Sequence, residues 1–98
     1  MAYGIVLEFT GVDQKQYDAV NEKLGIDMAK GAGDWPAGRR TARVAREPGG
    51  GFLVMEVWES KALQEAFMGT RLGAALGAVG VPNPHRVTEI DIVGYATP

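Results

Sequence analysis

The segment Phe52–Trp58 most constrains the fold, because seven residues of strand composition run directly into a helix start. Apolar, β-branched and aromatic side chains fill the segment, and Glu56 is its one charged residue. Ser60, a favoured N-cap residue, opens the helix-forming run Lys61–Phe67. The sequence therefore predicts a helix that leaves the end of a strand and packs back on a sheet. Trp58 lies at that corner, where a large aromatic side chain can line a cavity.

The amino-terminal part of the chain has the same two kinds of element in the same order. Alternation predicts a strand over Tyr3–Thr10, with four apolar side chains on one face: Tyr3, Ile5, Leu7 and Phe9. Asp13 and Gln16 have the spacing of a capping box at the start of a helix. The buried stripe of this helix is Tyr17, Val20 and Leu24, and Gly25 ends it.

Residues 26–38 have no regular pattern and contain three glycines, Pro36 and Trp35, so we expect a loop. Two interpretations of Trp35 are open. It belongs to a lid over a binding site, or it folds back to cover an edge of the core.

The next strand, Arg39–Arg46, is predicted to form a hairpin with the apolar segment that follows, and to lie at an edge of the sheet. In the expected register Arg43 lies opposite Glu56, and Thr41 lies opposite Trp58. A carboxylate inside an apolar strand needs a partner, so one interpretation of Glu56 is an ion pair with Arg43. The other is an unpaired carboxylate that faces a cavity and abstracts a proton.

The second helical region carries two apolar stripes that are out of phase. Leu63 and Leu72 are nine residues apart, which is half a turn out of phase on a straight α-helix. We therefore expect a break near Gly69 and a second short helix that ends at Gly80. Arg86–Tyr95 follows as the last strand.

The order β-α-β-β-α-β over a single domain, residues 1–98, predicts an α+β, ferredoxin-like fold. Its antiparallel four-stranded sheet would carry both helices on one face. Hydrophobic residues make up 46% of the chain and lie on both faces of the strands, so the second face of the sheet also needs cover. We expect a homodimer whose two sheets close into a dimeric α/β barrel.

Composition excludes several classes of site and partner. Without cysteine and with one histidine, the chain has no thiol nucleophile and no recognisable metal motif, so we expect no metal. No apolar run approaches the roughly 20 residues of a membrane span, and no basic leader precedes one, so we expect a cytoplasmic protein with no membrane partner. The arginines of 39–46 are either edge-strand charges or a phosphate-binding strip. Because the net charge is −2, we expect no nucleic-acid partner.

Motifs in the second half of the chain resemble those of a known family. They are Val57-Trp58-Glu59-Ser60, Arg71-Leu72-Gly73-Ala74-Ala75-Leu76 and Gly80-Val81-Pro82. They are similar to small actinobacterial proteins of the dimeric α/β-barrel superfamily and resemble its antibiotic biosynthesis monooxygenase group. The resemblance implies a pocket between the sheet and the helices of one subunit, with Trp58 as a wall. Haem-degrading members carry an iron-binding histidine on the second helix. Since residues 60–84 hold none, we expect no cofactor.

Six side chains are candidates for this site. His85, the sole histidine, titrates in the range that suits a general base, and Glu56 is the second catalytic candidate. The aromatic candidates for substrate binding are Trp58, Trp35, Tyr17 and Phe67. Each has a structural alternative: an exposed loop position for the histidine, an ion pair for the glutamate, and core packing for the aromatic residues.

Two functions follow from this site. The first is a cofactor-independent monooxygenase- or cyclase-like enzyme that acts on an aromatic, polyketide-like small molecule. The second is a non-catalytic module of the same fold that binds a small apolar or aromatic ligand, or a protein partner. The sequence leaves open which of the two applies.

Overall fold

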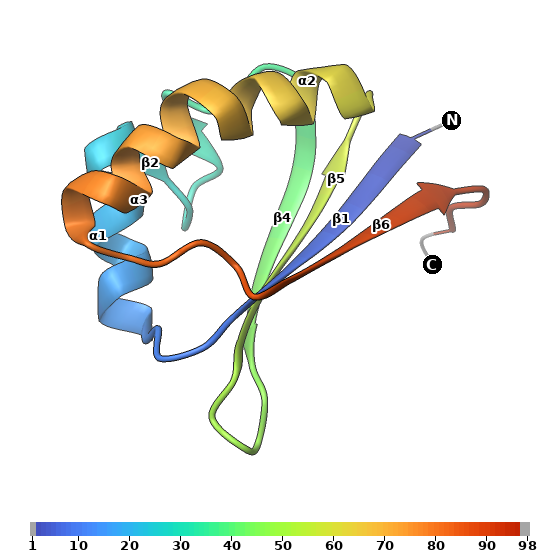
Figure 1. Cartoon of the computed structure of the whole chain (residues 1–98). Coiled ribbons are helices and arrows are strands. Elements are labelled where there is room, and N and C mark those ends of the chain that lie inside the picture. Colours follow the sequence, from blue (N-terminus) through green and yellow to red (C-terminus); the bar gives the residue numbers. More distant parts are fainter. Residues whose placement is uncertain (1, 97–98) are drawn as a thin grey trace.

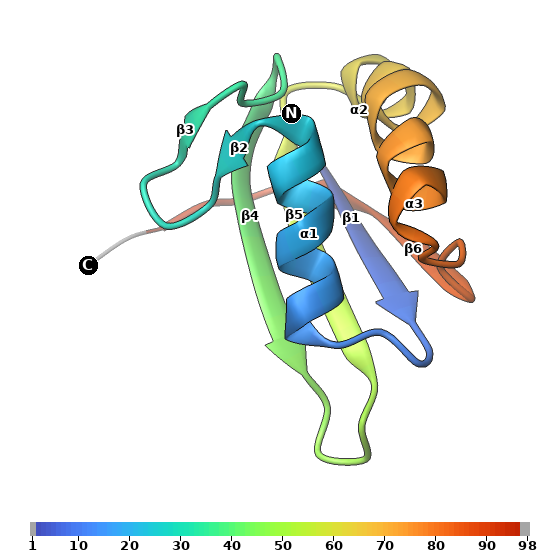
Figure 2. The ribbon, with the colours of Figure 1, turned by 90° about the vertical axis from the view of Figure 1, so that its left-hand side faces the viewer.

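The computed structural model describes residues 2–96, in which helices cover one side of an antiparallel sheet (Figure 1). The strands, in spatial order, are β4 (Arg39–Arg46), β5 (Phe52–Trp58), β1 (Ala2–Phe9) and β6 (Arg86–Ile92). Helix α1 (Gln14–Leu24) and the helical run from Lys61 to Val79 lie over the same face (Figure 2). The predicted ferredoxin-like α+β fold is confirmed. The predicted domain 1–98 also includes Met1, Thr97 and Pro98, which lie outside the described residues. None of the described helices has the length and apolar content to cross a membrane.

The inner face of β1 lies at the centre of the hydrophobic core, as the alternation predicts. Its side chains are all at least nine-tenths buried: Tyr3, Ile5, Leu7 and Phe9. The neighbouring strand β5 adds Phe52, Val54 and Trp58 from the same face. Burial of one large apolar side chain stabilises a fold by roughly 1.5–3 kcal/mol, so this double row accounts for much of the stability of the sheet.

Helix α1 begins and ends where the local signals predict. The side chain of Asp13 accepts a hydrogen bond from the backbone N–H of Gln16, and the Gln16 side chain accepts one from the backbone N–H of Asp13. Gly25 follows the last turn with a φ of 73°, a left-handed conformation that glycine adopts without steric cost. This helix turns Val20, Asn21 and Leu24 toward the sheet.

The predicted irregularity near Gly69 and the second short helix ending at Gly80 are confirmed, but the irregularity is a wider helical turn and not an interruption of the helix. Helix α2 (Lys61–Phe67), capped by Ser60, continues into a π-helical turn, η1 (Met68–Leu72), and then α3 (Gly73–Val79). The backbone N–H of Gly73 bonds to the carbonyl of Met68, five residues back, so the turn holds one extra residue. Because of that residue, Leu63 and Leu72 both pack on the core.

The segment between α1 and β4 is more ordered than the predicted loop. Strand β2 (Ile26–Asp27) pairs with β3 (Ala32–Gly33) in a second, two-stranded sheet. Gly33 has a φ of 78° and approaches the Gly25 carbonyl too closely for a side chain. Glycine therefore lets this short hairpin fold against the end of α1.

The β4–β5 hairpin is confirmed, with β4 at an edge, but the expected register is wrong by one residue. Ala42, not Arg43, lies opposite Glu56, and Thr41 lies opposite Val57. The five-residue turn sets this pairing, because the Glu47 backbone N–H bonds to the Gly51 carbonyl. A bulge between Arg39 and Thr41 then shifts the register again, so that Arg39 lies opposite Trp58.

No helix covers the other face of the sheet (Figure 1). Charged side chains on this face include Arg43 and the pair Glu8–Arg86. The strand pairings place six large apolar side chains on it: Val6, Leu53, Met55, Val57, Ile90 and Ile92. Met55 is 43% exposed and Ile90 is 44% exposed. The last strand ends at Ile92, earlier than the predicted Tyr95, so Val93 and Tyr95 follow it as exposed residues.

Candidate functional site

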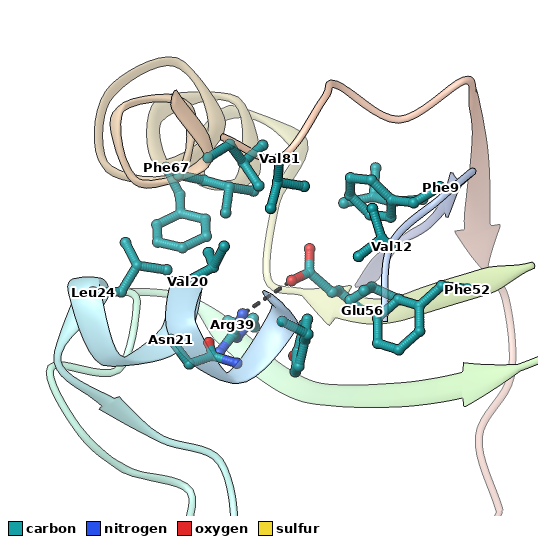
Figure 3. Close-up of a pocket in the computed structure, with 15 residues that line it drawn as sticks. Phe9, Val12, Val20, Asn21, Leu24, Arg39, Phe52, Glu56, Phe67 and Val81 are labelled. Atoms are coloured by element: carbon teal, nitrogen blue, oxygen red, sulfur yellow. Dashed lines mark hydrogen bonds and ion pairs between the residues drawn. The ribbon is translucent and has the colours of Figure 1, made fainter. Parts of the chain in front are cut away.

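A cavity lies between the sheet and the helices, at the position implied by the family resemblance (Figure 3). Its apolar lining comes from β1, β5, α1 and the second helical region, and includes Leu7, Val20, Phe52, Phe67 and Leu76. The volume of the cavity is about 40 Å³. The space between all the lining side chains is about 490 Å³, but this larger value includes open solvent. The enclosed part therefore has room for a few water molecules. A ring-sized ligand requires the outer part as well.

A buried ion pair forms the polar part of the lining. Arg39 Nη1 donates to Glu56 Oε2 at 2.9 Å, and each of the two side chains is 3% exposed. Trp58 Nε1 donates to the other carboxylate oxygen, Glu56 Oε1, at 3.2 Å. Both oxygens of Glu56 thus accept a hydrogen bond, and the two charges neutralise each other. The predicted partner, Arg43, is wrong, because the register places it opposite Met55 on the outer face.

The bulge in β4 explains why Arg39 is buried in a strand of otherwise exposed arginines. Regular alternation from Ala42 would turn Arg40 inward, but the extra residue turns Arg39 to the face of Trp58 instead. Trp35 covers the guanidinium from one side, with the Arg39 Cζ atom 4.3 Å from its ring centroid. The indole Nε1 of Trp35 also donates to the carbonyl oxygen of Arg39. Aromatic cover and a backbone hydrogen bond therefore hold this cation in place.

Two buried nitrogen atoms of the lining, Asn21 Nδ2 and Arg39 Nε, make no hydrogen bond of good geometry within the described residues. The Asn21 amide does lie beside the Tyr17 phenol and acts to lower its pKa. Asn21 is 7% exposed and Arg39 is 6% exposed. A buried donor without an acceptor destabilises a fold by about 1–3 kcal/mol. The Arg39 Nε–H therefore distinguishes the cavity from an ordinary packing defect.

Tyr17 completes the polar lining from α1. Its ring lies 5.5 Å from the ring of Phe52, in a tilted arrangement. Burial raises the pKa of the Tyr17 phenol above its ordinary value of 10.0, so the hydroxyl stays protonated at neutral pH. The phenol can then donate a hydrogen bond to a bound molecule.

A second arginine, Arg71, packs against Phe67 in the cavity wall. Arg71, in η1, donates to the carbonyl oxygens of Leu24 and Asp34 and pairs with the Asp34 carboxylate at 3.1 Å. The guanidinium also lies 5.4 Å from the centroid of the Phe67 ring, which lines the cavity. Arg71 thus joins the π-helical turn to the end of α1 and the segment after β3.

The structure brings together three of the six side chains proposed from the sequence. Tyr17, Phe67 and Glu56 line the cavity. Trp58, the expected wall of the pocket, is not among its lining residues: it is fully buried beside Phe67 and contacts the site by donating to Glu56.

The remaining two candidates lie outside the lining. Trp35 packs on the core edge and on Arg39, in agreement with the second interpretation of that residue. His85 is exposed, with its Nδ1 atom 2.9 Å from the hydroxyl of Thr10. The sequence predicts Glu56 and His85 as catalytic residues of one site. In the structure Glu56 lines the cavity and His85 lies on the surface outside its lining.

Two residues of the site, Asn21 and Arg39, were not proposed from the sequence. Asn21 follows Tyr17 by four residues, so helical periodicity alone would have put it on the buried face. No comparable signal exists for Arg39, because its direction depends on the bulge. Within residues 2–96 no group of three or more acidic, histidine or cysteine side chains could hold a metal ion.

Comparison with known proteins finds solved structures with a similar fold. No family model and no curated protein matches the chain. Among solved structures, a proposed antibiotic biosynthesis monooxygenase from Chloroflexus aurantiacus is similar, with a TM-score of 0.67, 17% identity, and 99% and 98% of the two chains covered. Rv0793 from Mycobacterium tuberculosis has a TM-score of 0.68 and 14% identity, over 99% of this chain and 100% of the other.

A third similar structure holds a ligand. It is a monooxygenase of Streptomyces coelicolor in complex with nanaomycin D, with a TM-score of 0.57, 16% identity, and 99% and 90% of the two chains covered. The expected resemblance to antibiotic biosynthesis monooxygenase-like proteins is thereby confirmed for the fold. At these identities the likeness carries no residue roles.

Proposed function

We propose that this chain is a small homodimeric enzyme of the monooxygenase or cyclase type, which acts without a cofactor on an aromatic, polyketide-like molecule. The observation that carries the proposal is the cavity between sheet and helices, where aromatic walls surround a buried polar group. Such a combination suits a ligand with a ring and a few oxygen substituents. A similar fold that holds nanaomycin D supports the same ligand class.

In the oxygenase version, the bound substrate supplies the electrons. A ring CH₂ activated by a phenol becomes a carbonyl: one atom of O₂ enters the product, and the other leaves as water with the two substrate hydrogens. Tyr17, Phe52 and Phe67 hold the ring in this proposal. Glu56 is the proton acceptor, since a carboxylate oxygen with one hydrogen bond keeps a free lone pair. His85, on the surface beside Thr10, has no role in this version.

The proposed dimer would use the open face of the sheet. Of the six large apolar side chains on it, Met55 and Ile90 are exposed and the other four are partly buried within the described chain. Apposition of two such faces would remove them from water and leave each cavity on the helix side of its own sheet.

The second candidate function is a non-catalytic carrier or sensor of a small aromatic ligand. The ion pair favours it, because Arg39 and Trp58 already donate to the two oxygens of Glu56.

A ligand screen with simultaneous oxygen measurement tests the proposal. Aromatic phenols are added to the protein while tryptophan fluorescence and dissolved oxygen are followed, because both indoles contact the ion pair. Quenching with oxygen uptake that Glu56→Gln abolishes and His85→Ala preserves would support the oxygenase. Quenching without uptake, but with a rearranged product, would support the cyclase, and quenching without any product would support the carrier. No quenching by any phenol would contradict all three.

A further inference from the structure

Two side chains in the cavity wall also face grooves on the surface of the molecule. Phe67 lines the cavity and a groove between α2 and the segment before β4. Leu24 lines the cavity and a second groove, between the end of α1 and α3. Figure 3 draws Leu24 and Phe67 at the end of the cavity opposite Phe9 and Phe52. At each of these two places a single side chain separates the cavity from a groove.

One arginine lies between the two grooves and holds both of these wall residues. Arg71 lines both grooves, and its Nη2 atom donates to the carbonyl oxygens of Leu24 at 3.1 Å and Asp34 at 2.7 Å. The same nitrogen lies 3.1 Å from Oδ2 of Asp34. The guanidinium is also 5.4 Å from the centroid of the Phe67 ring. Arg71 therefore contacts Leu24 through its backbone and Phe67 through its ring.

The pair between Arg71 and Asp34 is weak enough to break often. The two side chains are 33% and 73% exposed, so water and salt screen their attraction. An exposed pair of this kind changes an equilibrium by about fivefold or less. The buried pair of Arg39 and Glu56, in which each side chain is 3% exposed, is held far more firmly.

Arg71 also belongs to the least regular part of the helical run. The π-helical turn η1 follows Phe67 directly and contains Arg71. Such turns interrupt the regular hydrogen bonds of an α-helix and are frequent at functional sites. Gly69 lies in this turn with no atom near the position that a side chain would take, and glycine has the lowest helix propensity after proline. The wall of the cavity at Phe67 is therefore next to a segment that can move.

We propose that Arg71 and Asp34 form a latch that controls access to the cavity. While the pair is formed, Phe67 and Leu24 close this end of the cavity. When the pair breaks, η1 moves and opens a path from the surface grooves to Glu56. This proposal concerns entry to the cavity, and it depends neither on the ligand that binds there nor on a reaction.

Solvent exchange of the Trp58 indole N–H, followed by nuclear magnetic resonance, measures how often this end opens. This N–H donates to Glu56, and the fully buried indole lies 5.6 Å from the Phe67 ring, so movement of Phe67 exposes it to water. Arg71→Ala removes the ion pair and both carbonyl contacts, and should speed the exchange by about tenfold.

Asp34→Asn is a second variant, which keeps both carbonyl acceptors and removes only the charge. It should speed the exchange of the Trp58 indole by about two- to fivefold. The matched control is Arg86→Ala, which removes another exposed arginine–carboxylate pair, with Glu8, away from the cavity lining. This control should leave the exchange unchanged.

Urea separates opening of the latch from unfolding of the whole domain. A local opening exposes little surface, so low urea should leave the exchange of the Trp58 indole almost unchanged in the wild type. The backbone amides of Leu7 and Val54, in the buried core of the sheet, exchange by unfolding and should speed up as urea is added.

Two results would overturn the latch. One is exchange of the Trp58 indole that neither Arg71→Ala nor Asp34→Asn speeds. The other is exchange that rises with urea as steeply as that of Leu7 and Val54, because the indole would then be exposed only by unfolding. Since no ligand is used, failure of the ligand screen would leave the latch intact, and failure of the latch would leave the proposed ligand site open.

Discussion

Loss of one member of the Arg39–Glu56 pair should destabilise the fold far more than loss of both. Each side chain is 3% exposed, so Glu56→Leu would leave a guanidinium buried without a counter-charge. Removal of one partner from such a pair destabilises a protein by about 3–5 kcal/mol. Since domains of this size are stable by about 5–15 kcal/mol, this single change would remove a large fraction of the total.

The double variant Arg39→Met, Glu56→Leu should recover most of that loss. It replaces both charges with apolar side chains of similar volume, a change that is often neutral in other proteins. The indole N–H of Trp58 would still lose its acceptor, which leaves about 1–3 kcal/mol unrecovered. The two single variants and the double variant form a cycle whose coupling energy we expect to be about 3 kcal/mol or more.

Urea unfolding followed by circular dichroism, at one fixed protein concentration, measures all three variants. The control is Glu65→Gln, which breaks a solvent-exposed pair with Lys61 and should leave the unfolding midpoint unchanged. Additive effects in the double variant, or a loss below about 1 kcal/mol in each single variant, would refute the buried pair.

Three further perturbations test the sheet and its edges. Ile90→Glu places a charge on the open face and should convert the proposed dimer to monomer in light scattering, and a wild-type monomer would contradict the dimer itself. Burial and the hydrogen bond to Glu89 raise the pKa of Tyr3 to about 12, above its ordinary value of 10.0, so this part of the stability is complete below pH 10 and is lost as the pH rises toward 12. Urea midpoints at pH 9 and pH 11 should therefore fall more in the wild type than in Tyr3→Phe, and equal falls would contradict the shift. Gly38→Ala should destabilise by about 2 kcal/mol, because a φ of 83° and contact with a leucine side chain leave no room for a methyl group. Gly49→Ala, in open space, is its control, and equal unfolding midpoints for the two variants would refute the clash.

Local signals in the sequence were sufficient for the four long strands, the helices between them and their order, but not for the short strands β2 and β3. The capping box at Asp13 and the glycine at 25 act within one or two helical turns, so their effect is readable from neighbours alone. The alternation in β1 predicts its buried face for the same reason. The phase conflict between Leu63 and Leu72 was also visible, but sequence spacing could not distinguish a break from a π-helical turn.

The polar site depended on geometry that no local pattern encodes. One residue of register and one bulge decide that Arg39, and not Arg40 or Arg43, reaches Glu56. The carboxylate of Glu56 in an apolar strand correctly indicated the need for a partner. Which residue is that partner depends on the tertiary structure. Helical periodicity alone places Asn21 on the buried face of α1, but its place in the cavity beside Tyr17 became apparent only in the structure.

The location of the ligand is the central claim, and nuclear magnetic resonance tests it most directly. Titration of 1-naphthol into ¹⁵N-labelled protein follows the indole N–H of Trp58, the side-chain amide of Asn21 and the Nε–H of Arg39 in one spectrum. The account predicts that these signals move together at saturable concentrations, since all three groups belong to the cavity and its ion pair. Shifts confined to Met55 and Ile90, on the opposite face of the sheet, would contradict it.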